Sequence, residues 1–451
     1  MTVWANLNHL KILSNMHRKT YNNRNAAQVM VVTNSIDIGW RSERLFTGLT
    51  LEEFCLRSFL WTAGAMYFVV GLATVLVGSV LPQVISYYHV SYTVGGQLVF
   101  AQFIGFMAGV PAASLLMRRI EYRTLLALAG LFICVALCGI ALLPQVFIVA
   151  LLFVANGFGI ALSETAIATL IMERFVGRRA VVMSYLEVAF GLGAVCMPAI
   201  ASLFIVIHAW RFSFLFAGLL ALLSSIGWLT MTGAAKEAHD FATAEPLDAA
   251  SLASAVTGRG ARRALLFLFL LMTLLYVGIE SSLNSFLPAL FIPYLHVRSY
   301  VASLSVTTFW AAMVIGRTVA GWVVRKVSYA PFLFWSIAAA IVVLAAMTLW
   351  SSAVFCFSLI FVVGLAMSGV YSVTMVYANH VLPGATRIVT GLITAFAGIG
   401  GAVLPAVTGY AMDHTSPSGV IDLIAGSTFL LLVTLSVILL SERASRKAYL
   451  L

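Results

Sequence analysis

Two stretches of the chain, SLLMRRIEYRTLL (114–126) and GWVVRKVSYAPFL (321–333), share one pattern of residue types. In each, a run of apolar residues leads to a basic pair, and a tyrosine follows at Tyr122 or Tyr329. A shift of 207 residues superimposes the two stretches. The chain is therefore predicted to contain two copies of one unit.

The same shift aligns further residues along most of the chain. Glycine is abundant, at 34 residues, so a single matched pair carries little weight. A constant shift that holds from the first to the fifth apolar segment of each copy is typical of an internal repeat. The matched pairs are Gly71/Gly278, Gly109/Gly316, Gly157/Gly364, Gly177/Gly384, Gly191/Gly398, Gly193/Gly400 and Pro198/Pro405.

The composition excludes a soluble protein. Of the 451 residues, 62% are hydrophobic and only 9% are charged, whereas soluble domains have about 45–50% apolar and 25% charged residues. A membrane-spanning helix needs about 20 predominantly apolar residues. Hydropathy predicts twelve such helices, at 59–81, 93–117, 124–143, 146–172, 181–206, 211–232, 264–292, 299–324, 329–350, 353–379, 386–411 and 419–440.

The basic residues predict how the chain lies in the membrane. Of the 26 Lys and Arg residues, 23 lie in the two ends or in the connections that follow the second, fourth, sixth, eighth and tenth spans. The other three are Arg211, Arg298 and Arg317. Cytoplasmic loops collect Lys and Arg, so both termini are predicted to be cytoplasmic. The net charge of +10 then reflects membrane topology, and we expect no nucleic-acid partner.

The domain organisation follows from the spans. Six helices per copy is an even number, so the two copies have the same orientation and are related by an axis along the membrane normal. This arrangement is typical of the major facilitator architecture, in which the substrate site lies between the halves near the membrane midplane. The predicted parts are a cytoplasmic tail (1–57), a six-helix bundle (58–232), a cytoplasmic loop (233–263), a second six-helix bundle (264–440) and a cytoplasmic tail (441–451).

Four charged residues fall within predicted spans, namely Glu164, Glu187, Glu280 and Arg317. A charged group at a helix centre costs about 2.5–3.5 kcal/mol on insertion scales, so such residues usually face a cavity or a partner. Glu164, within Ala-Leu-Ser-Glu-Thr-Ala, is predicted to bind and release a proton as substrate passes. The alternative is a neutral carboxyl group hydrogen-bonded to a neighbouring Ser or Thr.

A group of polar and aromatic residues is predicted to bind substrate. Glu280 and Asn284 are four residues apart and share a helix face. A carboxylate and an amide beside aromatic rings suit a hydroxyl-rich ligand such as a sugar. Gln102 and Trp310 are further candidates, with helix packing as the alternative, and Tyr371 occupies the repeat position of Glu164.

Glu187 and Arg317 are predicted to form a gate between the halves. They lie at similar depths in the fifth and eighth spans, which adjoin across the interface of this fold. An ion pair there would close the cytoplasmic side in one state and break in the other. The alternative is that each residue is bonded within its own half. Glu187 is also a second candidate for proton coupling.

Several stretches resemble the fucose/hexose-type permeases of the major facilitator superfamily, most closely the bacterial glucose/mannose:proton symporters. The resemblance covers about residues 58–440. The acid-Thr pair Glu164-Thr165 and the run LEVAFGLGA (186–194) are its most specific parts. The four stretches are QFIGFMAGVPAASLLMRRIEYRTL (102–125), GFGIALSETAIATL (157–170) with MSYLEVAFGLGAVCMP (183–198), YVGIESSLNSFLP (276–288) and SVTTFWAAMVIGRTVAGWVVRKV (305–327).

The resemblance implies proton coupling through a carboxylate on the fourth span, which falls on Glu164. Two departures change what is expected. Arg118 stands where the superfamily loop motif has an Asp, and Arg325 stands at the repeat position. The acid that fucose-type members carry on the first span is absent, so coupling rests on Glu164 alone, or on Glu164 with Glu187 or Glu280.

The sequence therefore predicts a secondary transporter of the cell membrane that imports a hexose with a proton, as a monomer surrounded by lipid. Efflux of a drug or metabolite is the first alternative, but GLGAVCMPAIAS (191–202) lacks the Gly-Pro…Gly-Gly run of proton-coupled drug antiporters. Uncoupled facilitation is the second. An enzyme is not expected, because the spans hold no DxxxD or HxxxH pair. No phosphate-binding loop or metal-ligand spacing occurs either, so no cofactor and no metal are expected.

Overall fold

The computed structural model describes residues 51–175, 179–230, 260–324, 326–382 and 386–448, which form helices and no strand. The predicted all-helical membrane class is confirmed. Residues 1–50 of the predicted tail and 233–259 of the predicted central loop lie outside the described residues. The helices are α3 (Leu51–Tyr88), α4 (Tyr92–Leu116), α5 (Tyr122–Ala141), α6 (Val146–Arg174), α7 (Arg179–Val206), α8 (Phe212–Thr230), α10 (Gly260–Leu295), α11 (Ser299–Val323), α12 (Tyr329–Leu349), α13 (Ala353–Met367), α14 (Val370–Val381), α15 (Thr386–His414) and α16 (Pro417–Ala448).

The described residues hold twelve segments long and apolar enough to cross a membrane. Their outer faces carry large apolar side chains: Trp61, Trp335 and Leu349 are 72%, 70% and 85% exposed. Exposed apolar surface of this extent suits lipid rather than water. Polar residues such as Asn156 and Ser303 are fully buried instead. The fold thus turns its apolar faces outward and its polar groups inward.

Several helices are longer than the sequence predicts. The first span is predicted to end at 81, just before Pro82, yet α3 continues through Pro82 to Tyr88. Similarly, α10 contains both Pro288 and Pro293 and begins at Gly260, inside the predicted central loop. Within a membrane, neighbouring helices and local adjustments satisfy the backbone groups that a proline frees, so proline need not end a helix. The last helix, α16, likewise runs to Ala448, into the predicted C-terminal tail.

The tenth predicted span is broken into two helices. α13 ends at Met367 and α14 begins at Val370, with a turn at Ser368 and Gly369 between them. A Cβ atom on Gly369 would lie 2.8 Å from Phe332 Cζ and 2.9 Å from Ala320 Cβ, so the turn packs tightly on its neighbours. The equivalent fourth span, α6, is continuous. The break is therefore a feature of the second copy alone.

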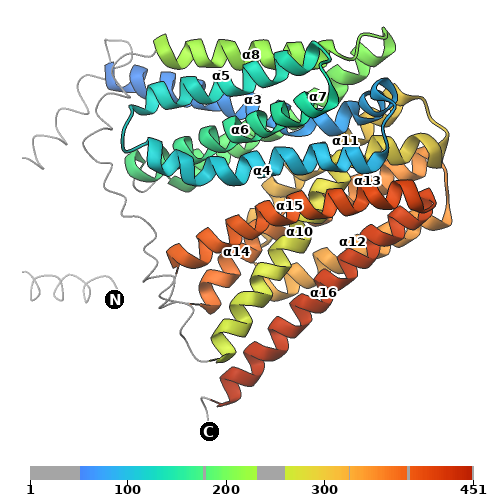
Figure 1. The fold of residues 1–451 in the computed structure, drawn as a ribbon. Helices are drawn as coiled ribbons and strands as arrows, with labels where there is room; N and C mark the ends of the chain where they lie inside the picture. The colour runs from blue at the N-terminus through green and yellow to red at the C-terminus, as the bar shows by residue number, and fades with distance from the viewer. Residues whose placement is uncertain (1–50, 176–178, 231–259, 325, 383–385, 449–451) are drawn as a thin grey trace, which may run out of the picture. The chain divides into compact units, whose positions relative to one another are not determined.

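The helices form two halves, α3–α8 and α10–α16, that meet along three pairs of helices. α4 packs against α15 and α7 packs against α11. α3 crosses α10 so closely that a Cβ atom on Gly78 would lie 2.2 Å from the Asn284 carbonyl oxygen. In Figure 1 the second half, drawn in yellow to red, lies below the first, drawn in blue to green.

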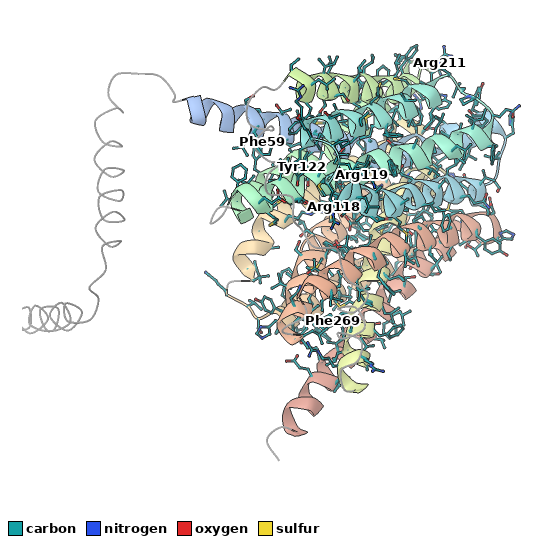
Figure 2. All side chains as sticks on the ribbon, turned by 60° about the vertical axis from the view of Figure 1, so that its left-hand side comes forward. Phe59, Arg118, Arg119, Tyr122, Arg211 and Phe269 are labelled. Carbon is teal, nitrogen blue, oxygen red and sulfur yellow. The ribbon has the colours of Figure 1, made fainter. Side chains whose placement is uncertain are left out.

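The bundle has two ends, which we name by what they carry. The terminal end carries Ser58, the end of α8, the start of α10 and the end of α16; the opposite end carries the connections at 89–91, 142–145, 207–211, 296–298, 350–352 and 415–416. Arg118 and Arg119, labelled in Figure 2, follow α4 at the terminal end, whereas Arg211 precedes α8 at the opposite end. The positions of these arginines follow the expected pattern of charge.

Candidate functional site

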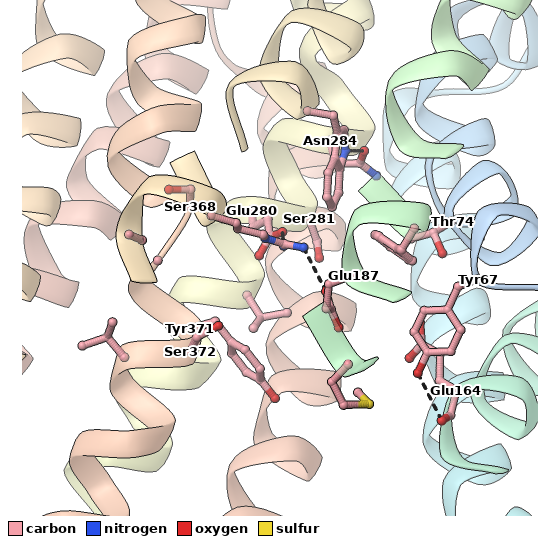
Figure 3. A pocket seen from close by; sticks show the side chains of 18 of the residues that line it. Tyr67, Thr74, Glu164, Glu187, Glu280, Ser281, Asn284, Ser368, Tyr371 and Ser372 are labelled. Carbon is pink, nitrogen blue, oxygen red and sulfur yellow. Dashed lines mark hydrogen bonds and ion pairs between the residues drawn. The ribbon is translucent and has the colours of Figure 1, made fainter. Parts of the chain in front are cut away.

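A cavity of about 730 Å³ lies between the two halves. This volume falls within the range of sites for small molecules, about 300–1,000 Å³. Figure 3 shows side chains of both halves converging on it. Its polar lining residues are Tyr67, Thr74, Gln102, Glu164, Ser184, Glu187, Glu280, Ser281, Asn284, Ser285, Arg317, Tyr329, Ser368, Tyr371 and Ser372.

Arg317 joins three helices at the centre of this cavity. Its Nη1 lies 3.2 Å from Oε2 of Glu187 on α7, and its Nη2 lies 3.7 Å from Oε1 of Glu280 on α10. The side chains of Arg317 and Glu280 are 28% and 14% exposed, whereas that of Glu187 is 50% exposed. One guanidinium group thus binds a carboxylate of each half. A planar guanidinium, with five donors, can hold both at once.

The face of Trp310 supports the same arginine. Arg317 Cζ lies 5.5 Å from the centroid of the Trp310 ring, within cation–π range. The indole Nε1–H donates a 2.8 Å hydrogen bond to Asn284 Oδ1, and both residues are buried. Because Asn284 Oδ1 accepts from Trp310, the Asn284 Nδ2 group remains to donate toward the cavity. The ring of Phe190 lies 5.5 Å from that of Trp310.

Glu164 lines the other side of the cavity, on α6. The Tyr67 hydroxyl donates to the Glu164 carbonyl oxygen over 3.5 Å, which ties α3 to α6 beside this residue (Figure 3). Within the described part of the chain, no Lys, Arg or His nitrogen lies within 4.0 Å of the Glu164 carboxylate. Glu164 therefore differs from Glu187 and Glu280, which share an arginine.

Gln102 and Tyr371 complete the predicted set. Gln102 on α4 is buried, and its Oε1 accepts a 3.4 Å hydrogen bond from Nδ2 of the fully buried Asn156 on α6. Tyr371 lies in the first turn of α14, directly after the break, with its ring 6.4 Å from that of Tyr276. Ser368 and Gly369, in the turn between α13 and α14, keep right-handed helical backbone angles. Both residues line the cavity.

All the residues singled out from the sequence line the cavity: Gln102, Glu164, Glu187, Glu280, Asn284, Trp310, Arg317 and Tyr371. Their roles stay predictions. The contact between Arg317 and Glu280 is not predicted by the sequence, which indicates Glu280 for substrate binding and Arg317 for the gate. In the part of the chain that the structure describes, no three His, Cys, Asp or Glu side chains are grouped to hold a metal ion.

Sequence reasoning missed most of the hydroxyl groups that line the cavity. Tyr67 and Thr74 are seven residues apart on α3, and Ser281 and Ser285 are four apart on α10, so each pair shares a helix face. That spacing was readable from the sequence. Hydroxyl groups in spans are nonetheless weak signals, because many bond to their own helix, as Thr74 Oγ1 does to the Val70 carbonyl oxygen at 2.8 Å.

The cavity extends toward the terminal end. Its lining reaches Ser184 near the start of α7 and Val324 just after α11. At the opposite end, the halves are joined by direct contacts. Ser202 Oγ donates to the Tyr300 carbonyl oxygen at 2.8 Å, and a Cβ atom on Gly96 would lie 2.9 Å from Ala406 Cα. The described state is therefore closed at the opposite end.

Comparisons with known proteins agree with this architecture. The chain is 27% identical over 352 residues to the glucose/mannose transporter GlcP of Bacillus subtilis, covering 78% of this chain and 87% of that one. It is 24% identical over 413 residues to the bypass of stop codon protein 6 of Saccharomyces cerevisiae, covering 84% and 82%.

Solved structures of transporters share the fold. The nucleoside transporter NupG matches with a TM-score of 0.71 at 14% identity, over 85% of this chain and 99% of that one. A bacterial homolog of the human lysosomal transporter Spinster, in an inward-facing, unoccupied conformation, matches with a TM-score of 0.66 at 16% identity, over 85% and 96%. The sequence model of the Major Facilitator Superfamily matches residues 63–405 and 269–449. The chain is therefore a multi-pass membrane transporter, not an enzyme, and it belongs to the Major Facilitator Superfamily.

Proposed function

We propose that this chain is a secondary active transporter that takes up a hexose together with a proton by alternating access. The observation that carries the proposal is the cavity between the halves, where carboxylates, an arginine, hydroxyl groups and aromatic rings converge. The similarity to a glucose/mannose transporter supports a hexose as the substrate. A rocking of one half against the other would expose the cavity to each side in turn.

The substrate is held, in this proposal, by groups from both halves. A hexose presents several hydroxyl groups and an apolar ring face, so it needs donors, acceptors and aromatic surface together. Glu280 accepts, Asn284 donates, and Trp310 and Tyr371 offer ring surface on the second half. Gln102 offers a side-chain amide from the first half. Contacts to both halves would let the bound sugar draw them together.

The proton is carried by Glu164, with Glu187 as the second candidate. Glu164 can take up a proton without breaking an ion pair, since no described cationic side chain lies within 4.0 Å of it. Protonation of Glu187 instead would weaken its contact to Arg317, which spans the halves at 3.2 Å. We propose the Glu187–Arg317 contact as the gate between the halves, formed in one state and broken in the other. The contact is formed in the described state, although the cavity there extends toward the terminal end.

We further propose that the protein acts as a monomer in the cell membrane, with both termini in the cytoplasm. The positive-inside rule supports this orientation, because Arg118 and Arg119 lie at the terminal end. In that orientation the cavity leads to the cytoplasm, and the described state faces inward. A proton entering with substrate would use about 2.3 kcal/mol per charge per 100 mV to drive uptake.

A substrate-panel uptake assay tests the proposal. Purified protein in proteoliposomes is offered labelled hexoses, nucleosides and amino acids, each with and without an imposed proton-motive force. We expect a hexose to be taken up, and to accumulate above its outside concentration only when the force is present. Uptake without accumulation would indicate a facilitator, accumulation in the reverse direction an exporter, and transport of another panel compound alone would refute the hexose.

A further inference from the structure

A carboxylate of the second half binds the start of a helix of the first half at the opposite end of the bundle. Asp413 lies in the last turn of α15, and its Oδ1 accepts the backbone N–H of Tyr92 at 2.9 Å. Its Oδ2 accepts the backbone N–H of Thr93 at 2.7 Å and the Thr93 hydroxyl at 2.6 Å. Three hydrogen bonds to one side chain therefore join the halves at this point.

The position of Asp413 suits its charge. The first N–H groups of a helix have no partner within the helix, and its N-terminus carries a partial positive charge. Hydrogen bonds to an ionised acceptor are also shorter and roughly twice as strong as neutral ones. Ser91 Oγ accepts from Val94 N–H at 3.4 Å, so the next donor of α4 is bound within its own half. Asp413 therefore provides, from across the interface, acceptors for the first two N–H groups of α4.

The backbones approach closely beside this contact. A Cβ atom on Gly409 would lie 2.5 Å from the Tyr92 carbonyl oxygen and 3.2 Å from Gly96 Cα. A Cβ atom on Gly96 would lie 2.9 Å from Ala406 Cα and from the Pro405 carbonyl oxygen. Any opening of the halves at this end must separate these glycines and also remove Asp413 from α4.

Among the described residues, a contact of this kind joins α15 to α4 but not α7 to α11. The repeat shift of 207 residues places Val206 at the position of Asp413 and Tyr300 at that of Thr93. There, α7 and α11 are joined by Ser202 Oγ, which donates to the Tyr300 carbonyl oxygen at 2.8 Å. The second interface therefore has a neutral hydrogen bond where the first has a carboxylate bound to a helix start.

We propose that Asp413 is a positioning residue for the transport cycle, which holds the opposite end closed by binding the start of α4 and must release it for that end to open. It acts through the relative placement of the halves and does not contact the cavity. Its removal is expected to raise the ratio of opposite-end-open to closed molecules roughly tenfold, since hydrogen bonds to charged groups are among the stronger contacts in proteins.

Pulsed electron–electron distance measurements test this inference without any substrate, so the outcome is independent of the hexose proposal. Spin labels are placed by Leu142→Cys and Leu349→Cys, in a background whose five native cysteines are replaced by serine or alanine. These two positions are 83% and 85% exposed and lie at the opposite end on different halves. Their separation reports whether that end is closed.

Asp413→Asn and Asp413→Ala are each expected to add a longer distance, with the open-to-closed ratio raised roughly tenfold. Thr93→Val, which removes only the hydroxyl contact, should give a smaller shift in the same direction. Thr415→Ala is the matched control, because Thr415, directly after α15, donates through Oγ1 to the Ala411 carbonyl oxygen of the same half at 2.8 Å. A distance distribution in Asp413→Ala that equals that of the unsubstituted chain would overturn the proposal. If neither Asp413 variant folds, the Thr93→Val distribution decides in the same way.

Discussion

Glu164 is the residue on which proton coupling is proposed to depend. Glu164→Gln keeps the size and hydrogen-bonding capacity of the side chain but cannot release a proton. We expect it to abolish accumulation against a gradient, which for one proton can reach roughly 50-fold per 100 mV, while counterflow exchange of the same sugar persists. Glu164→Asp, which retains a titratable carboxyl group, serves as the control and should accumulate sugar in part. Unchanged accumulation in Glu164→Gln would refute the role.

Arg317 and Glu187 are predicted to depend on each other across the interface. Glu187→Arg and Arg317→Glu should each strongly reduce transport, because each places like charges at a 3.2 Å contact. The double reversal should restore part of it. Rescue is expected to be incomplete, since the carboxylate introduced by Arg317→Glu would face Glu280, which now lies 3.7 Å from Arg317. Initial uptake rates of all three variants measure this, and a double variant no better than the single ones would exclude the pairing.

Trp310 is predicted to orient Asn284 for the substrate. Trp310→Phe keeps a ring beside Arg317 but removes the Nε1–H that donates to Asn284 Oδ1 at 2.8 Å. A buried acceptor left without its donor costs about 1–3 kcal/mol, so the KM for the sugar should rise about tenfold or more. The change should fall mainly on KM rather than on the maximal rate. A KM within about twofold of the unsubstituted value would show that this hydrogen bond does not position Asn284.

At the residue level, the sequence identified the charged groups better than the hydroxyl groups. Charged groups in spans are rare and costly, so Glu164, Glu187, Glu280 and Arg317 stood out, and all four line the cavity. Their pairing was less readable, because it depends on which helices meet and how far each reaches. Ser368, which lines the same cavity, gave no signal, since it belongs to a break that nothing in its apolar surroundings predicted.

Gly369 is predicted to be essential to the break between α13 and α14. Gly369→Ala would place a Cβ atom 2.8 Å from Phe332 Cζ and 2.9 Å from Ala320 Cβ. Overpacking of this kind costs about 1–3 kcal/mol, so the unfolding temperature of the purified protein should fall. Gly426→Ala on α16 is the matched control, since no atom lies within 4 Å of its added Cβ. Equal unfolding temperatures for the two variants would show that the break tolerates a side chain.

At the level of helices, the sequence predicted number and order well and ends poorly. Hydropathy is a property of many residues together, so each of the twelve predicted spans overlaps an observed one. The predicted end of the first span at 81 is wrong, because the helix continues through Pro82 to Tyr88. The break at Ser368 and Gly369 is not predicted, because the repeat relates this span to α6, which is continuous.

The whole molecule follows from the repeat and from the charge of its ends. The shift of 207 residues predicted two equivalent halves, and the contacts of α4 with α15 and of α7 with α11 are the pair of interfaces that such a relation produces. What the repeat does not carry is asymmetry. The broken tenth span, the two carboxylates that share Arg317, and Asp413 on α15 all differ between the copies. We expect function to depend on these differences, because two identical halves would offer the same groups to the proton and to the sugar.

Proton movement during sugar entry shows whether the two are transported together. Weakly buffered proteoliposomes with no imposed gradient are given glucose or mannose outside, and the pH of the medium is recorded together with uptake of the labelled sugar. We expect the medium to become more alkaline as sugar enters, and Glu164→Gln to take up sugar without this change. Sugar entry with a constant external pH, or with acidification, in the unsubstituted protein would contradict this expectation.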